Sequence, residues 1–311
     1  MKATLVSWTH KPIETVLSVW DASKSEEPLG DIFDHYFEHS EEQGISSGGI
    51  GAPEMALFER ILDQQIPVAQ FINFNFVLED VPISWREQAV RHRIGVKYGD
   101  NYAVDIVPEA DISFWSQSMR IQSMEDFAEK GKFHTPESIK ESHPAMTIYA
   151  DAMEHIERAY GLLVQMGIPM EDARNLIPLG ATHRISMSVN LQALKHIIGE
   201  RGCWILQGSL WAPVIESMVS ELAKKVHPIF RRLVAPPCVS GGVFNSCKFV
   251  EENIRRVDGR DALPVCPLYV TEHNVKLTND QIVAMEKRIP EYATLWGQPR
   301  LYNTYAWQDA K

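Results

Sequence analysis

Alternation of apolar and polar residues along short segments most constrains this fold, because such a segment can bury only one of its two faces. Residues 70–80, QFINFNFVLED, carry Phe74 and Phe76 at alternate positions, which is typical of a strand in a sheet with one half-polar face. Residues 2–8, KATLVSW, alternate in the same way, and residues 182–189, THRISMSV, also indicate a strand. We therefore expect the chain to build a sheet.

Segments with helical spacing of apolar residues separate these strands. We expect helices at residues 12–23, 29–44, 146–166, 190–201, 210–226 and 278–289, and one more that carries Trp85, Ala89 and Val90. The longest has one apolar side, made of Ile148, Ala152, Ile156, Tyr160 and Leu163. Strands and helices together predict a mixed α/β (α+β) fold.

The C-terminal part of the chain has a different composition. From about residue 228 to 276 it is rich in Pro, Gly and Cys and shows no clear period. We expect one mixed α/β domain over residues 1–227 and an irregular C-terminal extension, residues 228–311, packed on it.

The charge balance limits the partners. Of 311 residues, 30 are Lys or Arg and 41 are Asp or Glu, which gives a formal net charge of −11. This balance argues against nucleic-acid binding, which needs a broad basic face, but it permits a small anion in a local basic pocket. The sequence has no apolar run near the roughly 20 residues of a membrane span, no signal-peptide pattern and no disulfide framework among its four cysteines. We expect a cytoplasmic protein without a membrane partner.

Several basic groups are candidates for such a pocket. The segment WREQAVRHR places three basic residues directly after a predicted helix, with Gln88 one turn before the first of them. An Arg fork beside a hydroxyl suits a phosphate monoester, because the guanidinium can donate two parallel charge-assisted hydrogen bonds. Scattered Arg residues are also common as solvated surface groups. The candidates are Arg91, His92, Arg93, Ser118, Arg120, Arg174 and Arg201.

Taken in order, these motifs resemble the flavin-dependent thymidylate synthases. QAVRHR is followed by SQSMR and later by ARNLIPLG and SVNLQALKHIIGERGCWILQ. The family is marked by an Arg-His-Arg triplet, then a Ser and an Arg two residues later, and a further block with Ala-Arg-x-x-Leu-Pro and Val-Asn. The resemblance covers roughly residues 1–210 and is specific in these two blocks.

The resemblance implies a role for each matching residue. It assigns the flavin cofactor FAD to Arg91, His92, Arg93, Asn190 and His196. It assigns the nucleotide substrate to Gln88, Ser118, Arg120, Arg174 and Arg201, with Arg201 reaching in from a neighbouring subunit. Ser118, Arg174 and Arg201 would lie closest to the chemistry, and the family is a homotetramer with shared active sites.

The implied reaction is a methyl transfer. The family adds a one-carbon unit from methylene-tetrahydrofolate to C5 of dUMP to form dTMP, and NADPH supplies the electrons through FAD. Two alternatives stay open. One is a divergent C5 methylase or hydroxymethylase acting on dCMP, UMP or dUMP, and the other is a nucleotide-binding relative without catalysis.

Departures from the family pattern lie mainly on the flavin side. The segment between the triplet and Ser118 is longer than in the family and includes an insertion at residues 94–112. Trp115 and Ser116 stand where the family has an Asn-Glu pair. A Gly-His motif reads Gly51-Ala52, and a second flavin-side His is replaced by Ile205. The nucleotide-side residues therefore match the family pattern better than the flavin-side residues do.

Four cysteines form a separate candidate site. Tetrahedral thiolate ligation of zinc, or of an iron–sulfur cluster, would stabilise an irregular segment. No C-x-x-C pair is present, so four buried apolar thiols are the alternative. The residues are Cys203, Cys238, Cys247 and Cys266.

Overall fold

The computed structural model describes residues 1–38, 50–63, 67–92, 112–117, 126–202 and 210–235. These residues form two compact units. The sheet unit contains Met1–Trp8 and Asn73–Asn190, and the helical unit contains Thr9–Ile72 and the described chain from Leu191 onward. None of the helices in the described ranges has the length and apolar character that crossing a membrane requires.

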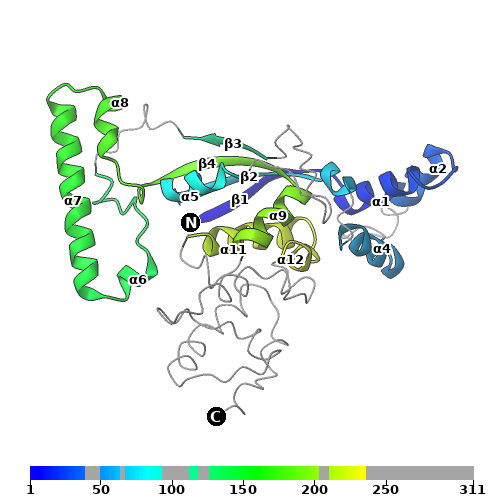
Figure 1. Cartoon of the computed structure of the whole chain (residues 1–311). Coiled ribbons are helices and arrows are strands. Elements are labelled where there is room, and N and C mark those ends of the chain that lie inside the picture. Colours follow the sequence, from blue (N-terminus) through cyan, green and yellow to red (C-terminus); the bar gives the residue numbers. More distant parts are fainter. Residues whose placement is uncertain (39–49, 64–66, 93–111, 118–125, 203–209, 236–311) are drawn as a thin grey trace, which may run out of the picture. The chain divides into compact units, whose positions relative to one another are not determined.

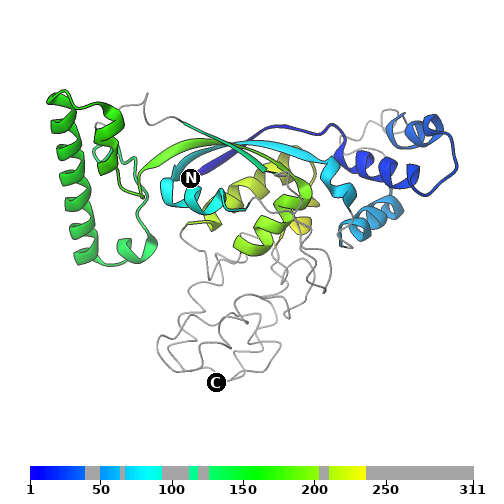
Figure 2. The same cartoon turned by 45° about the horizontal axis from the view of Figure 1, so that its top comes forward.

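A four-stranded antiparallel sheet is the centre of the sheet unit (Figure 1). Its strands lie in the order β1-β2-β4-β3, so the long strands β2 and β4 are central, and they twist across one another (Figure 2). The strands are β1 (Lys2–Trp8), β2 (Asn73–Pro82), β3 (Ile112–Ser116) and β4 (Thr182–Asn190). The three strands expected from the sequence are confirmed, and β3 is an addition.

The register separates a buried face from a polar face. Leu5, Phe76 and Met187 align across three strands and are buried, as period-two alternation requires. One position along, Val77 aligns with Ser186 on the opposite, more polar face. The strands therefore bury one continuous apolar surface.

A bulge in β2 extends that buried surface. The register shifts by one residue between Leu78, opposite Ile185, and Val81, opposite His183. Asp80 lies inside this bulge with φ 57°, a left-handed conformation that Asp tolerates better than most residues. Because of the extra residue, Leu78 and Val81 both face the core although they are three positions apart.

Helices connect and flank the strands of this unit. α5 (Ile83–Ala89) follows β2 directly, and α7 (His143–Gln165) is a 23-residue helix that packs with α6 (Glu137–Lys140) and α8 (Met170–Ala173). Ser142 caps α7 by accepting a hydrogen bond from the backbone N–H of Ala145. The helix ends in a Schellman motif, because Ile168 N–H donates to Leu163 C=O and Gly167 N–H donates to Val164 C=O.

The inner face of α7 packs on a small apolar cluster. Met153 and Tyr160 are buried there with Phe127, Ala173 and Ala181, and Tyr149, Ile156 and Leu163 lie against the cluster. The prediction of which side of α7 is buried was partly wrong, because Ile148 and Ala152 are exposed. A helix with apolar residues around most of its circumference leaves the choice of buried side to its neighbours.

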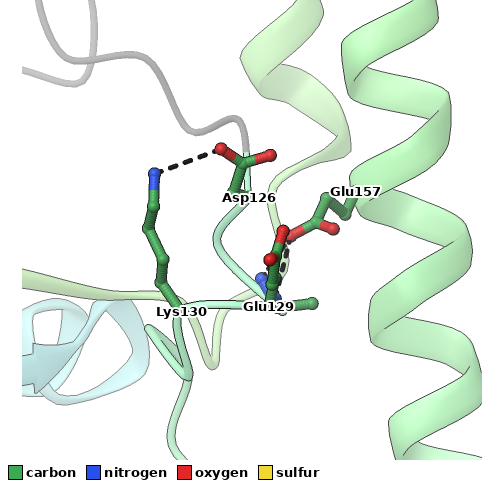
Figure 3. A network of polar contacts seen from close by, with 5 residues as sticks. Asp126, Glu129, Lys130 and Glu157 are labelled. Atoms are coloured by element: carbon green, nitrogen blue, oxygen red, sulfur yellow. Dashed lines mark hydrogen bonds and ion pairs between the residues drawn. The ribbon is translucent and has the colours of Figure 1, made fainter.

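A glutamate of α7 holds the turn at residues 126–130. One carboxylate oxygen of Glu157 accepts hydrogen bonds from the backbone N–H groups of Ala128 (2.5 Å) and Glu129 (3.2 Å) (Figure 3). Lys130 forms an ion pair with Asp126 at 3.1 Å within the same turn. This turn carries the buried Phe127, so the charged contacts outside and the apolar contact inside fix the same segment.

The helical unit is built from amphipathic helices and short turns. α1 packs against α4 and the turn η2, and α11 packs against α12. Lys195 Nζ donates to Leu62 C=O at 2.7 Å, and Leu191 N–H donates to Ile72 C=O at 2.8 Å, so α9 is tied to the chain around η2. The elements are α1 (Pro12–Ala22), α2 (Leu29–Phe33), η1 (Asp34–Glu38), α4 (Ala52–Asp63), η2 (Pro67–Phe71), α9 (Leu191–Arg201), α11 (Ala212–Lys225) and α12 (Phe230–Leu233).

The described part of the helix expected at residues 29–44 is not a continuous α-helix; residues 39–44 and the helix expected at residues 278–289 lie outside the described residues. The chain forms a short α-helix, α2, and then a π-helical turn over Asp34–Glu38. The Tyr36 hydroxyl donates to the Asp21 carboxylate of α1. Apolar spacing does not distinguish an α-turn from a wider π-turn, so the sequence pattern could not predict this change.

Gly167 provides a test of the end of α7. Its φ is +83°, so Gly167→Ala should lower the free energy of unfolding by about 1 kcal/mol through left-handed strain. Gly161, inside the same helix, has no atom within 4 Å of an added Cβ, and Gly161→Ala should raise stability by roughly 0.5–1 kcal/mol. Urea unfolding of both variants measures the difference, and equal effects of the same sign would contradict the assignment.

Candidate functional site

The basic segment begins at the end of α5. Trp85 and Ala89 are buried and anchor the helix, while Gln88 is half-buried. Arg91 N–H donates to Gln88 C=O at 3.3 Å and His92 N–H donates to Ala89 C=O at 3.0 Å, so one more helix-like turn follows the helix. Arg91 is exposed and His92 is half-buried, and Gln88 lies one turn before Arg91, as the sequence predicted.

Arg174 lies on the turn that follows α8. It is the first residue of η3 (Arg174–Leu176), and its guanidinium is 3.6 Å from a carboxylate oxygen of Glu171. Both side chains are about one-third to one-half exposed, so water screens this ion pair and its contribution is small. A phosphate could therefore replace Glu171 as the partner of Arg174 at little cost.

Hydrogen bonds bring the start of α5 beside the chain that follows Arg174. Ile83 N–H donates to Ala181 C=O at 3.0 Å, and Ser84 N–H donates to Leu179 C=O at 2.9 Å. These bonds satisfy two of the free N–H groups at the first turn of α5. The candidate substrate residues of α5 and of η3 thus belong to one end of the sheet.

Asn190 lies at the opposite end. It is the last residue of β4, is 4% exposed, and is paired in register with Asn73. Pro82 pairs with Thr182 at the other end of the same two strands. At about 3.3 Å per residue, the strand rise separates these two ends by roughly 25 Å.

The remaining described candidates lie on α9 in the helical unit. His196 is half-buried in the middle of the helix, and Arg201 is its half-buried last residue. The Arg201 guanidinium stacks 5.4 Å from the ring centre of the buried Trp211. This cation–π contact holds the guanidinium in place, and the carbonyl end of the helix favours its positive charge.

Other predicted site residues lie outside the described residues. These are Arg93, Ser118, Arg120, Cys203, Cys238, Cys247 and Cys266, together with the insertion at residues 94–112 except for Ile112. Among the residues that the structure does describe, no group of three or more His, Cys, Asp or Glu side chains could hold a metal ion. The metal site at the four cysteines stays a prediction.

Strand β3 was missed by the sequence analysis although it carries Trp115 and Ser116. It pairs with β4, and the Trp115 side chain is 80% exposed. Gln117 continues the pairing, because its N–H donates to Arg184 C=O at 2.9 Å. The segment ISFWS has aromatic residues that favour strands, and this local signal could have identified β3.

A buried histidine was also missed. His183 of β4 is 7% exposed, lies opposite Val81, and among the described residues neither of its ring nitrogens has a hydrogen-bond partner. Burial lowers its pKa from the ordinary value, the positive charge of Arg86 lowers it further, and a backbone contact with Val81 opposes these effects. Alternation with Ile185 along β4 would have placed His183 on the buried face.

Solved structures show a similar fold. A crystal structure of thymidylate synthase X from Helicobacter pylori with FAD and dUMP superposes with a TM-score of 0.51, covering 75% of this chain and 99% of that one at 13% identity. A second structure of the flavin-dependent enzyme from the same organism gives a TM-score of 0.50 with 74% and 98% coverage. The expected mixed helix-and-sheet fold is confirmed.

Sequence comparison identifies the family. The profile of the thymidylate synthase complementing protein family matches residues 4–228. Relatives named flavin-dependent thymidylate synthase include those of Pyrococcus abyssi, 26% identical over 255 residues, and Thermococcus onnurineus, 27% identical over 256 residues; each match covers 78% of this chain and 88% of the relative. The chain belongs to the thymidylate synthase complementing protein family, and the predicted resemblance to flavin-dependent thymidylate synthases is confirmed.

Replacing His183 should change the pH dependence of stability. Its folded pKa lies below the ordinary value of 6.5, so the unfolded chain takes up a proton first as the pH falls. The free energy of unfolding should therefore decrease below about pH 6.5, and His183→Leu should remove part of this decrease. Burial also lowers the pKa of His134 and His227, so a smaller pH dependence should remain.

Urea midpoints near pH 7.5 and near pH 5.5 would measure the effect. Substitution of the exposed His143 by Leu is the matched control and should leave the difference between the two midpoints as in the parent. An unchanged difference in His183→Leu would contradict the assignment.

Proposed function

We propose that this protein is a flavin-dependent thymidylate synthase that converts dUMP to dTMP. The observation that carries the proposal is the family match over residues 4–228, which spans every predicted nucleotide and flavin residue. The methylene carbon of methylene-tetrahydrofolate forms a bond to C5 of the uracil ring, its bonds to the folate nitrogens break, and C5 loses its proton. Two electrons from NADPH and a proton complete the methyl group, and tetrahydrofolate and NADP⁺ leave.

The chemistry of the described side chains fits FAD. Arg91 offers an exposed guanidinium that forms no salt bridge with any described residue, and such a group suits a pyrophosphate. His92 follows it half-buried, and Asn190 and His196 supply amide and imidazole groups. When bound, the flavin supplies the electron transfer, and the protein supplies binding and orientation.

Two arginines are assigned to the nucleotide. Arg174 has a weak, solvent-screened partner and would exchange it for the substrate phosphate. Arg201 is held by Trp211 and would stabilise negative charge that develops on the uracil carbonyl oxygens as C5 becomes nucleophilic. Ser118, Arg120 and Gln88 complete this proposed pocket, as the family pattern implies.

We also propose a homotetramer with shared active sites. The chain around Arg174 enters the sheet at its Thr182 end, whereas Asn190 terminates the other end, roughly 25 Å away along the strands. The uracil ring of the nucleotide must meet the flavin ring for the reaction, so the residues that hold the two molecules have to come closer together than this. Residues from different copies would satisfy that requirement.

Turnover under anaerobic conditions tests the reaction. The protein would be incubated with FAD, NADPH, methylene-tetrahydrofolate and each pyrimidine monophosphate separately, and the products identified by mass. We expect a methyl group to be added to dUMP. A hydroxymethyl product, or turnover of dCMP or UMP instead, would establish the divergent alternative, and the absence of both product and bound flavin would support a binding-only relative.

Single arginine variants test the site. Arg174→Ala and Arg201→Ala should each lower kcat/KM for dUMP by about 100-fold, since a charge-assisted contact is lost in the transition state. Arg231→Ala changes an exposed residue of α12 and should stay within about twofold of the parent. Melting temperatures close to that of the parent would show that the variants fold. Activity equal to the parent in both site variants would contradict the assignment.

A further inference from the structure

The outer side of α7 carries a mostly apolar stripe that is not buried against the other residues the structure describes. Its large members are well exposed, with Ile148 at 71% and Leu162 at 54%. The spacing alternates between three and four residues, the a/d pattern of a coiled-coil seam. The outer stripe consists of Ala145, Ile148, Ala152, His155, Ala159 and Leu162.

An adjacent side of the same helix, displaced by one residue or about 100° around its axis, already packs on the core of the sheet unit. Met153 and Tyr160 are buried there, with α6 and α8 beside the helix (Figure 1). The outer stripe is therefore a second apolar face that lies beside the buried one and stays exposed. A contiguous exposed apolar face on a folded protein indicates an interaction surface.

Residue sizes along the outer stripe alternate regularly. Alanine occupies one set of positions, and Ile148, His155 and Leu162 occupy the other. Two such helices packed in parallel would place alanine opposite alanine and leave gaps. Packed antiparallel, each large side chain faces an alanine of the other helix, which lets the two helices approach closely. We propose that α7 pairs antiparallel with α7 of a second copy of this chain.

Charges beside the stripe select the register. Asp151 and Arg158 flank it on one edge, are exposed, and form no salt bridge with any residue in the described ranges. They are seven residues apart, about 10 Å along the helix, so they cannot pair within one chain. When Ile148 faces Ala159 of the second copy, Asp151 faces Arg158 of that copy, and the two-fold symmetry repeats this pair.

A register shifted by seven residues gives less favourable charge pairs and poorer packing of side chains. A shift of one heptad places Arg158 opposite Arg158 of the second copy, which brings like charges together. It also places Ile148 opposite Met166, so two large side chains meet instead of a large and a small one. Packing and charge therefore favour the same arrangement, in which Ala152 and His155 of both copies lie around the two-fold axis.

The pairing concerns assembly and does not depend on the proposed reaction. It is an isologous contact, which can serve in a dimer or as one interface of a tetramer. Its test reads molecular mass rather than turnover, so its failure and the failure of the proposed function are distinguishable.

Charge reversal gives the sharpest test. Asp151→Arg alone and Arg158→Asp alone each replace two attractive contacts by two repulsive ones and should weaken self-association by about tenfold or more. The double variant Asp151→Arg/Arg158→Asp restores opposite charges and should recover the association of the parent. Sedimentation equilibrium of the full chain over a range of concentrations measures the dissociation constant.

Apolar variants complete the experiment. Ile148→Glu/Leu162→Glu should halve the mass of the parent assembly while helix content and melting temperature remain close to those of the parent, because both side chains are exposed in the single chain. Glu129→Arg alters an exposed charge outside the stripe and should leave the mass unchanged. A monomeric parent, a parental mass in the apolar variant, or no recovery in the double charge variant would overturn the proposal.

Discussion

The antiparallel pairing of β2 with β4 is the constraint on which the rest of the sheet unit depends. These two strands are central, and each is followed directly by a helix that carries candidate site residues. Because the strands run in opposite directions, α5 begins where the chain from Arg174 enters the sheet, whereas Asn190 lies at the other end of β4. The register therefore sets which end of the sheet the candidate residues Arg174 and Asn190 belong to before any side chain is considered.

Burial on one face of this sheet also explains its local irregularities. The left-handed Asp80 and the extra residue in β2 keep Leu78 and Val81 on the same face. The same alternation buries His183 without a described hydrogen-bond partner, which disfavours its charged form. One apolar surface thus governs strand register, backbone strain and the ionisation of a histidine.

Helix α7 shows why an apolar pattern identifies a helix more reliably than its buried side. Apolar residues lie both on the face around Met153 and Tyr160 and on the outer stripe around Ile148 and Leu162. The side predicted from the sequence combined residues of both faces, because the sequence of a helix does not specify which other elements it packs against. A second copy of the chain would account for both faces, because each would then have an apolar partner.

The sequence by itself determined the strands around Phe76 and Ile185, most of the helices, and the family, because periodicity and ordered motifs are properties of contiguous residues. Only the tertiary structure decided that Trp115 lies on an edge strand, that α7 buries Tyr160 rather than Ile148, and that Arg174 and Asn190 belong to opposite ends of the sheet. These outcomes depend on contacts between residues far apart in the chain, and local patterns do not specify such contacts.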